Sequence, residues 1–174
     1  MMKLNQVNIL LLLPALAVAF VTIGCGGEQR PAGMPPLFRL TIHVTQEGQP
    51  LDDVTVNLVC PDGSMPWVIG AVTDSDGNAT IMTQGRFAGA PEGTFRVTLQ
   101  KDYMENFQAL REAEAVGDSA AIARISPTVR NLQLIGDDYM SPTDTPLTVE
   151  VTRSTRTITV DAGPAVRIER PFIR

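Results

Sequence analysis

The stretch Phe-Arg-Leu-Thr-Ile-His-Val-Thr, residues 38–45, alternates apolar and polar side chains without a break. A period of two with several β-branched residues predicts a strand that is buried on one face only. The fold therefore begins as a sheet with one face toward a core. The apolar face of this strand carries Phe38, Leu40, Ile42 and Val44.

The same alternation recurs along the chain between turns rich in Gly, Pro, Asn and Asp. Short strands at this spacing predict a mainly β fold, specifically an antiparallel β-sandwich of seven or eight strands that spans residues 37–174. The further predicted strands are 53–60, 67–73, 79–83, 94–101, 147–151, 156–160 and 165–168.

One segment, 102–124, departs from this alternation. Tyr103, Phe107 and Leu110 stand at the i, i+4 and i+7 positions of a helix face. The segment is therefore predicted to be a helical insertion. Two interpretations of its apolar stripe stay open: the stripe docks on the sandwich, or it is exposed and binds a partner.

Capping residues fit the predicted insertion. Asp102 and Glu105 have the spacing of a capping box, with Asp in place of Ser or Thr. Gly117 breaks the segment, and Asp118 can cap a second short helix.

The N-terminus has the pattern of an export signal. One cation, Lys3, precedes an apolar run at 9–21 that Pro14 interrupts. The run is short for a membrane-spanning helix, which needs about 20 apolar residues. Residues 1–24 are therefore predicted to be a signal peptide.

Gly24-Cys25, at the end of this run, resembles the lipobox of bacterial lipoproteins. The resemblance implies that Cys25 is lipidated with acyl chains such as palmitate, and two or three chains anchor far more firmly than one. The alternatives are a spanning anchor or an ordinary signal with a chance cysteine. Gly26 is not the Asp of a familiar inner-membrane retention signal, so an exported protein on the outer membrane is favoured where the host has one. Residues 25–36, rich in Gly and Pro, predict a flexible tether.

The stretch "VTDSDGNATI" (72–81) has the spaced oxygens of a calcium loop. Counted from Asp74, however, the positions that need Gly and a bidentate Glu hold Ala79 and Gly85. Asp-Gly at residues 76–77 is instead a strong hairpin signal. The stretch is predicted to be a turn that needs no metal.

Catalytic groups are sparse. His43 is the only histidine and lies on the polar face of its strand, where a solvated side chain is the commoner role. The adjacent carboxylates Asp52-Asp53 and Asp137-Asp138 fall in turns and are expected to be solvated. We therefore expect no catalytic residue, cofactor or metal.

Two further residues have both a structural and a functional interpretation. Cys60 is expected to be a small core residue rather than a reactive thiol. Trp67 is expected to be partly buried, although it could stack on a sugar. The net charge of −5 argues against nucleic-acid binding, which depends on Lys and Arg.

Four stretches carry a resemblance to a known family. They are "GQPLDDVTVNLV" (48–59), "VTDSDGNATI" (72–81), "GAPEGTFRVTL" (89–99) and "YMSPTDTPLTVEV" (139–151). In this order they resemble the carboxypeptidase regulatory-like, transthyretin-like domain, and behind a lipobox they are similar to small bacterial lipoproteins of the planctomycete type. The resemblance implies an Ig-like or prealbumin-like sandwich and carries no shared catalytic residues.

Two functions follow as alternatives. The first is a non-enzymatic, lipid-anchored cell-envelope protein whose sandwich binds a protein or glycan, alone or in a larger envelope assembly. The second is a transthyretin-like hydrolase, although the hydroxyisourate hydrolases of that family need a histidine pair that a chain with one His cannot supply. Candidate binding loops are 46–52, 61–66, 84–93 and 136–146.

Overall fold

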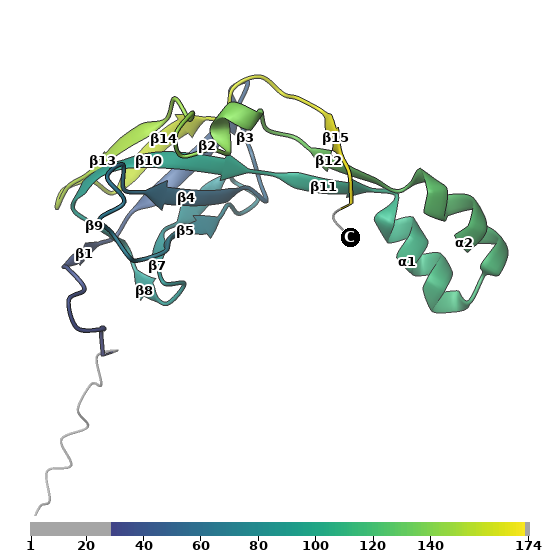
Figure 1. Cartoon of the computed structure of the whole chain (residues 1–174), viewed down its shortest axis with the longest axis horizontal. Helices are drawn as coiled ribbons and strands as arrows, with labels where there is room; N and C mark the ends of the chain where they lie inside the picture. Colours follow the sequence, from purple (N-terminus) through teal and green to yellow (C-terminus); the bar gives the residue numbers. More distant parts are fainter. Residues whose placement is uncertain (1–28, 173–174) are drawn as a thin grey trace, which may run out of the picture.

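The structure is a computed structural model that describes residues 29–172 (Figure 1). The predicted signal peptide and the predicted lipidation of Cys25 lie outside the described residues. Residues 29–36 form neither helix nor strand. Within the described part, none of the helices is long and apolar enough to cross a membrane.

The fold is mainly β, and its largest sheet has six strands, all antiparallel to their neighbours. Its longest strand is β10, whose alternation turns Phe95, Val97 and Leu99 into the interior. In order across the sheet the strands are β13 (Thr148–Val151), β10 (Gly93–Gln100), β4 (Thr55–Val59), β5 (Ile69–Val72), β7 (Met82–Thr83) and β8 (Phe87–Ala88).

A second sheet forms around β2, and a short ribbon joins the start of the domain to the strand before β10. The strands of the second sheet are β14 (Thr157–Asp161), β2 (Thr41–Gln46) and β3 (Gln49–Pro50), and β6 (Asn78–Thr80) also pairs with β2. The ribbon consists of β1 (Leu37–Phe38) and β9 (Ala90–Pro91).

The expectation of an entirely antiparallel arrangement is wrong, because β14 runs parallel to β2. The segment 152–156 does not return the chain in a hairpin beside β13. It carries the chain from the six-stranded sheet to the other sheet, where Thr157 lies opposite Thr41 and Asp161 opposite Thr45.

Side chains from both sheets form one buried cluster. Ile42 and Val44 come from β2 and Val160 from β14, while Val56 and Phe95 come from the six-stranded sheet. Burying a side chain of this size contributes about 1.5–3 kcal/mol relative to leaving it in water. The inward face predicted for residues 38–45 is therefore confirmed from Leu40 onward; Phe38 is only half-buried.

The stretch 74–78 is a turn built by one side chain, as predicted. Asp74 Oδ1 accepts hydrogen bonds from the backbone N–H groups of Asp76 (3.0 Å) and Asn78 (2.8 Å). Gly77 has φ +74°, and a Cβ there would lie 2.6 Å from the carbonyl oxygen of Val44. Only glycine fits this position, both for its backbone angle and for its close approach to β2.

The chain leaves the body after β10 and forms a protruding arm, residues 102–133 (Figure 1). Two strands form its ribbon, two helices form its tip, and β15 pairs with β12 along one edge. The arm consists of β11 (Asp102–Glu105), α1 (Phe107–Val116), α2 (Ser119–Ile125), η1 (Ser126–Thr128) and β12 (Arg130–Gln133). The remaining elements are η2 (Asp137–Tyr139) and β15 (Ile168–Arg170).

The predicted helical insertion is only partly correct. Residues 102–105 form a strand because they pair with 130–133, so Asp102 and Glu105 do not make a capping box. The first helix begins after Asn106, which has φ +60° and makes no side-chain cap. Asp118 caps the second helix as predicted: its side chain accepts from the N–H of Ala121 at 3.0 Å.

Candidate functional site

His43 lies on the outer face of the second sheet, away from the core. Its Nδ1 is 3.0 Å from the side-chain oxygen of Asn78 on the neighbouring strand. An amide in that place does not supply the negative charge with which a carboxylate stabilises a catalytic imidazolium.

The thiol of Cys60 lies at the margin of the core, half-buried rather than fully buried as predicted. It donates to Asp62 Oδ1 at 3.0 Å. This hydrogen bond, with others from the hydroxyl and backbone N–H of Ser64, lowers the pKa of Asp62 to about 2. Trp67 is partly buried against the core, as predicted, and lines an adjoining cavity of about 310 Å³.

The two pairs of adjacent carboxylates have different partners. Asp52 accepts from Lys101 Nζ at 2.6 Å, and this hydrogen bond lowers the pKa of Asp52. Asp137 pairs with Arg170, whose hydrogen bond is the main cause of the lowered pKa of Asp137. Each of these carboxylates is held in its ionised form beside a cation, which suits a structural or binding role.

A cleft of about 580 Å³, lined mainly by residues with polar side chains, lies at the base of the arm, between its ribbon and η2. Gln133, only 1% exposed, organises it: its amide N–H₂ donates to the Ile135 carbonyl and to Asp137, both at 2.6 Å. Its amide oxygen accepts from Arg170 Nε at 2.8 Å. Buried polar groups that are all paired fix one geometry. The other lining residues are Gln100, Asp102, Asn131, Met140, Ser141 and Pro171.

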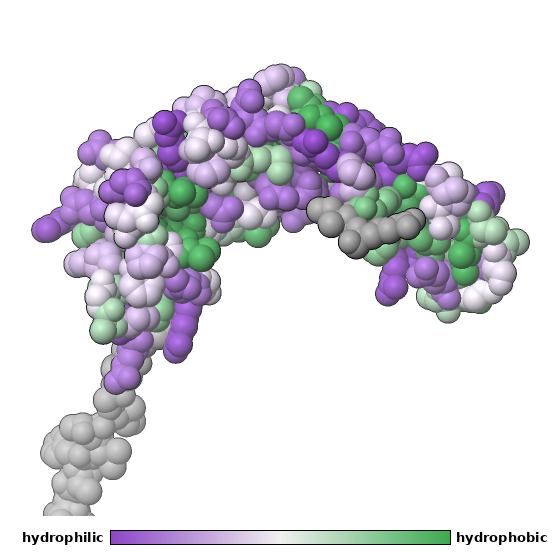
Figure 2. All heavy atoms as spheres, viewed as in Figure 1, coloured by the Kyte–Doolittle hydropathy of each residue, from purple (hydrophilic) through white to green (hydrophobic). Residues whose placement is uncertain are grey.

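Exposed apolar residues concentrate on the arm. Of the seven large hydrophobic side chains that the described part exposes, four lie there: Tyr103 at 53%, Met104 at 39%, Phe107 at 38% and Val116 at 79%. Figure 2 shows hydrophobic residues gathered on the helical end of the arm. Exposed apolar side chains of this size are candidate contacts for a partner.

The prediction that Tyr103, Phe107 and Leu110 dock on the sandwich is therefore wrong. Tyr103 stands on a strand and the other two on a helix, so a single helical face does not exist. The helices contact each other at the end of the arm, and the core cluster contains no residue from them. Of the second interpretation, an exposed stripe, only the exposure of Tyr103 and Phe107 agrees with the structure, because Leu110 is half-buried.

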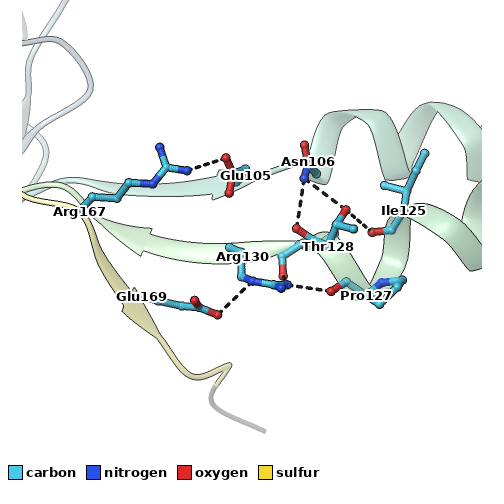
Figure 3. A network of polar contacts seen from close by, with 9 residues as sticks. Glu105, Asn106, Ile125, Pro127, Thr128, Arg130, Arg167 and Glu169 are labelled. Atoms are coloured by element: carbon cyan, nitrogen blue, oxygen red, sulfur yellow. Dashed lines mark hydrogen bonds and ion pairs between the residues drawn. The ribbon is translucent and has the colours of Figure 1, made fainter.

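Polar contacts hold the arm in one shape (Figure 3). Arg167 bonds to Glu105 at 2.5 Å, and Arg130 bonds to Glu169 at 3.2 Å, so both strands of the ribbon are tied to the segment around β15. At the junction with the helices, Asn106 Nδ2 donates to the carbonyl of Thr128 at 3.1 Å. The arm buries few apolar side chains, Ala113 and Leu132 among them, and neither belongs to the core cluster of the body.

The candidate loops do not gather at one end of the molecule. Loop 46–52 precedes β4 and loop 61–66 follows it, so the two lie at opposite ends of that strand. Of the four loops, only 136–146 contributes to the cleft, through Asp137, Met140 and Ser141.

Sequence reasoning missed Gln133 and the strand that carries it. A signal was present, because residues 131–134 alternate amide and leucine side chains. That run is short and follows a predicted helix, so the pairing of β12 with β11 and β15 could not be read from it.

Comparison with known proteins identifies no relative of this chain. No family model matches the chain, and neither a curated protein nor a solved structure matches it. The chemistry of the arm and its cleft therefore rests on the contacts described above.

Proposed function

We propose that the protein is a lipid-anchored cell-envelope protein that binds another envelope protein through its arm. In this proposal Cys25 carries the anchor and the body is a non-catalytic Ig-like or prealbumin-like sandwich of the carboxypeptidase regulatory-like type. The single core cluster shared by two sheets supports the sandwich. The parallel pairing of β14 with β2 differs from the antiparallel sandwich that the sequence predicts.

The observation that carries the proposal is the exposed apolar surface of the arm. Tyr103 and Phe107 are large aromatic side chains on a projection whose strands and helices are joined by polar contacts. Aromatic anchors dominate the energetics of protein interfaces, and a rigid surface loses little entropy when it binds.

The cleft allows this surface to discriminate between binding partners. Amide, carboxylate and guanidinium groups lie side by side there, and Asp137 already neutralises Arg170. Such a site favours a partner that offers hydrogen-bonding groups rather than a strong charge. The side chain of Asn131 makes no hydrogen bond to any other described residue, so both its donor and its acceptor are free for a partner.

Affinity capture with matched variants tests the proposal. The full-length protein is expressed in its own envelope, cross-linked, purified from solubilised membranes and compared with Tyr103→Ala/Phe107→Ala. The control is Val68→Ala/Val72→Ala, which removes two apolar residues from the body that are at least as exposed as Tyr103 and Phe107.

We expect a discrete partner that the wild type and the control capture and that the arm variant loses at least tenfold. An interface anchor typically contributes more than 1 kcal/mol, and two together give this loss. Equal capture by all three proteins would show that the arm is not the binding surface.

A further inference from the structure

A second cavity, of about 410 Å³, lies at the end of the body where the chain enters from the predicted tether. Arg39 lines it, one residue beyond β1, and Arg156 lines it, one residue before β14. Gly89 and Ala88 close another side with backbone and a small side chain.

Three threonines form a row across this cavity. Thr41 lies opposite Thr157 on one neighbouring strand and opposite Thr80 on the other, so the three side chains share one face of the sheet. All three line the cavity. None of their hydroxyls makes a hydrogen bond to another described residue. The row therefore presents three donors with no partner.

The two arginines supply charge that nothing in the described chain neutralises. Arg39 is exposed and makes no ion pair or side-chain hydrogen bond with any described residue. Arg156 is held in place because its Nη1 donates to the carbonyls of Arg153 (2.8 Å) and Thr155 (3.0 Å). Both bonds engage the same nitrogen, which leaves the other guanidinium N–H groups free.

The chemistry of this site matches a phosphate group. Guanidinium groups bind phosphate oxygens with two parallel hydrogen bonds, and hydroxyl donors complete the shell. The contrast with the rest of the chain is large, because the net charge of the whole protein is −5. None of the residues that line the cavity is acidic, and Glu92, three residues after Gly89, is paired with Arg153 at 3.6 Å.

We propose that this cavity, with Arg39, Arg156 and the row Thr41, Thr80 and Thr157, binds the phosphate of an anionic lipid headgroup. The inference rests on the proposed lipid anchor at Cys25. Arg39 is 14 residues beyond that cysteine, so the chain limits their separation to about 50 Å. Headgroup binding would lay this end of the body on the membrane and point the arm away from it.

Hydrogen exchange of the full-length lipidated protein in vesicles tests the proposal. One set of vesicles is phosphatidylcholine, the second also contains phosphatidylglycerol, and the third is phosphatidylcholine with inorganic phosphate in solution. The site variant is Arg39→Gln/Arg156→Gln, and the matched control, with the same loss of charge on the arm, is Arg111→Gln/Arg124→Gln.

We expect amides in 38–44 and 155–160 to exchange at least about fivefold more slowly with phosphatidylglycerol, the effect of one arginine at an anionic surface. The control should keep this protection and the site variant should lose it, with an unchanged denaturation midpoint.

Two results would overturn the proposal: equal exchange in both lipids, or the same protection from inorganic phosphate alone. Failure of the anchor itself is separate, since a chain without it would leave the vesicles of either composition. Failure of the proposed arm function would appear in partner capture and not in this exchange pattern.

Discussion

The body and the arm are built from similar strands and use them differently. Phe95 in β10 is 1% exposed, whereas Phe107, at the start of the helix that follows β11, is 38% exposed. The two regions follow each other directly in the chain, because β11 begins two residues after β10 ends. The alternation of side chains predicts pairing, but a core forms only where a second sheet covers one face.

This difference separates stability from binding. In the body, apolar side chains from two sheets lose contact with water together. In the arm, strand pairing and exposed polar contacts fix the shape, and isolated surface ion pairs contribute only about 0–1 kcal/mol each. Truncation of core side chains in the body should therefore lower the stability of the fold strongly, and truncation of exposed side chains in the arm should lower it little.

The comparison is sharpest when the same substitution, phenylalanine to alanine, is made in the body and in the arm. Phe95→Ala should lower the free energy of unfolding by about 3–5 kcal/mol, because it leaves a cavity in a closed core. Phe107→Ala should lower it by less than about 1 kcal/mol, because water already reaches that ring. Denaturant titration of the two variants checks both values, and similar losses would mean that the arm is part of the core.

A second prediction concerns the turn that positions β6 against β2. Gly77→Ala should cost about 3 kcal/mol, because the left-handed backbone and a Cβ pressed against the Val44 carbonyl both oppose it. Gly48→Ala is the control: it has φ +79° but open space around it, so only about 1–2 kcal/mol is expected. Thermal unfolding measures the difference in stability between the two variants. Equal losses of stability would show that the close approach of Gly77 to Val44 does not contribute.

The smallest expected effect is a pH dependence in the body. Hydrogen bonds from Cys60 and Ser64 lower the pKa of Asp62 to about 2 in the folded protein. A lowered pKa stabilises the fold above the unfolded value of about 3.9, and this contribution is lost as the pH falls toward 2. Because Asp62 is exposed, the change in stability should be slight.

Carbon-detected NMR titration of the Asp62 carboxyl gives the direct measurement. Cys60→Ala should raise its pKa toward the usual range, because the hydrogen bond from the thiol is the largest cause of the lowered pKa. Asp137, at the base of the arm, should respond to Arg170→Gln and not to the cysteine change. A pKa of Asp62 that ignores Cys60→Ala would contradict the assigned cause.

The sequence was a good guide where one residue or one alternating run decides the structure. Residues 94–99 alternate and form β10, and the spacing around Asp74 predicts the turn that Asp74 builds. Asp118 as a helix cap belongs to the same class. In each case the contacts that matter are local or follow directly from which face is apolar.

The sequence was a poor guide where distant segments meet. Tyr103 and Phe107 have helical spacing, but pairing with 130–133 makes a strand of the first and leaves the second on a helix. The parallel placement of β14 depends on a crossing between sheets that no local pattern records. The cleft joins Gln133 and Asp137 to Arg170, and the separation of 37 residues between Gln133 and Arg170 hides that contact in the sequence.

The most direct test of the arm as a binding surface is site-specific photo-crosslinking in the native envelope. A photoreactive phenylalanine analogue replaces Phe107 on the arm or, in a separate protein, the more accessible Val72 on the body. The account predicts one discrete crosslinked protein from the position of Phe107 and none from that of Val72. The same products from both positions, or none from the position of Phe107, would contradict it.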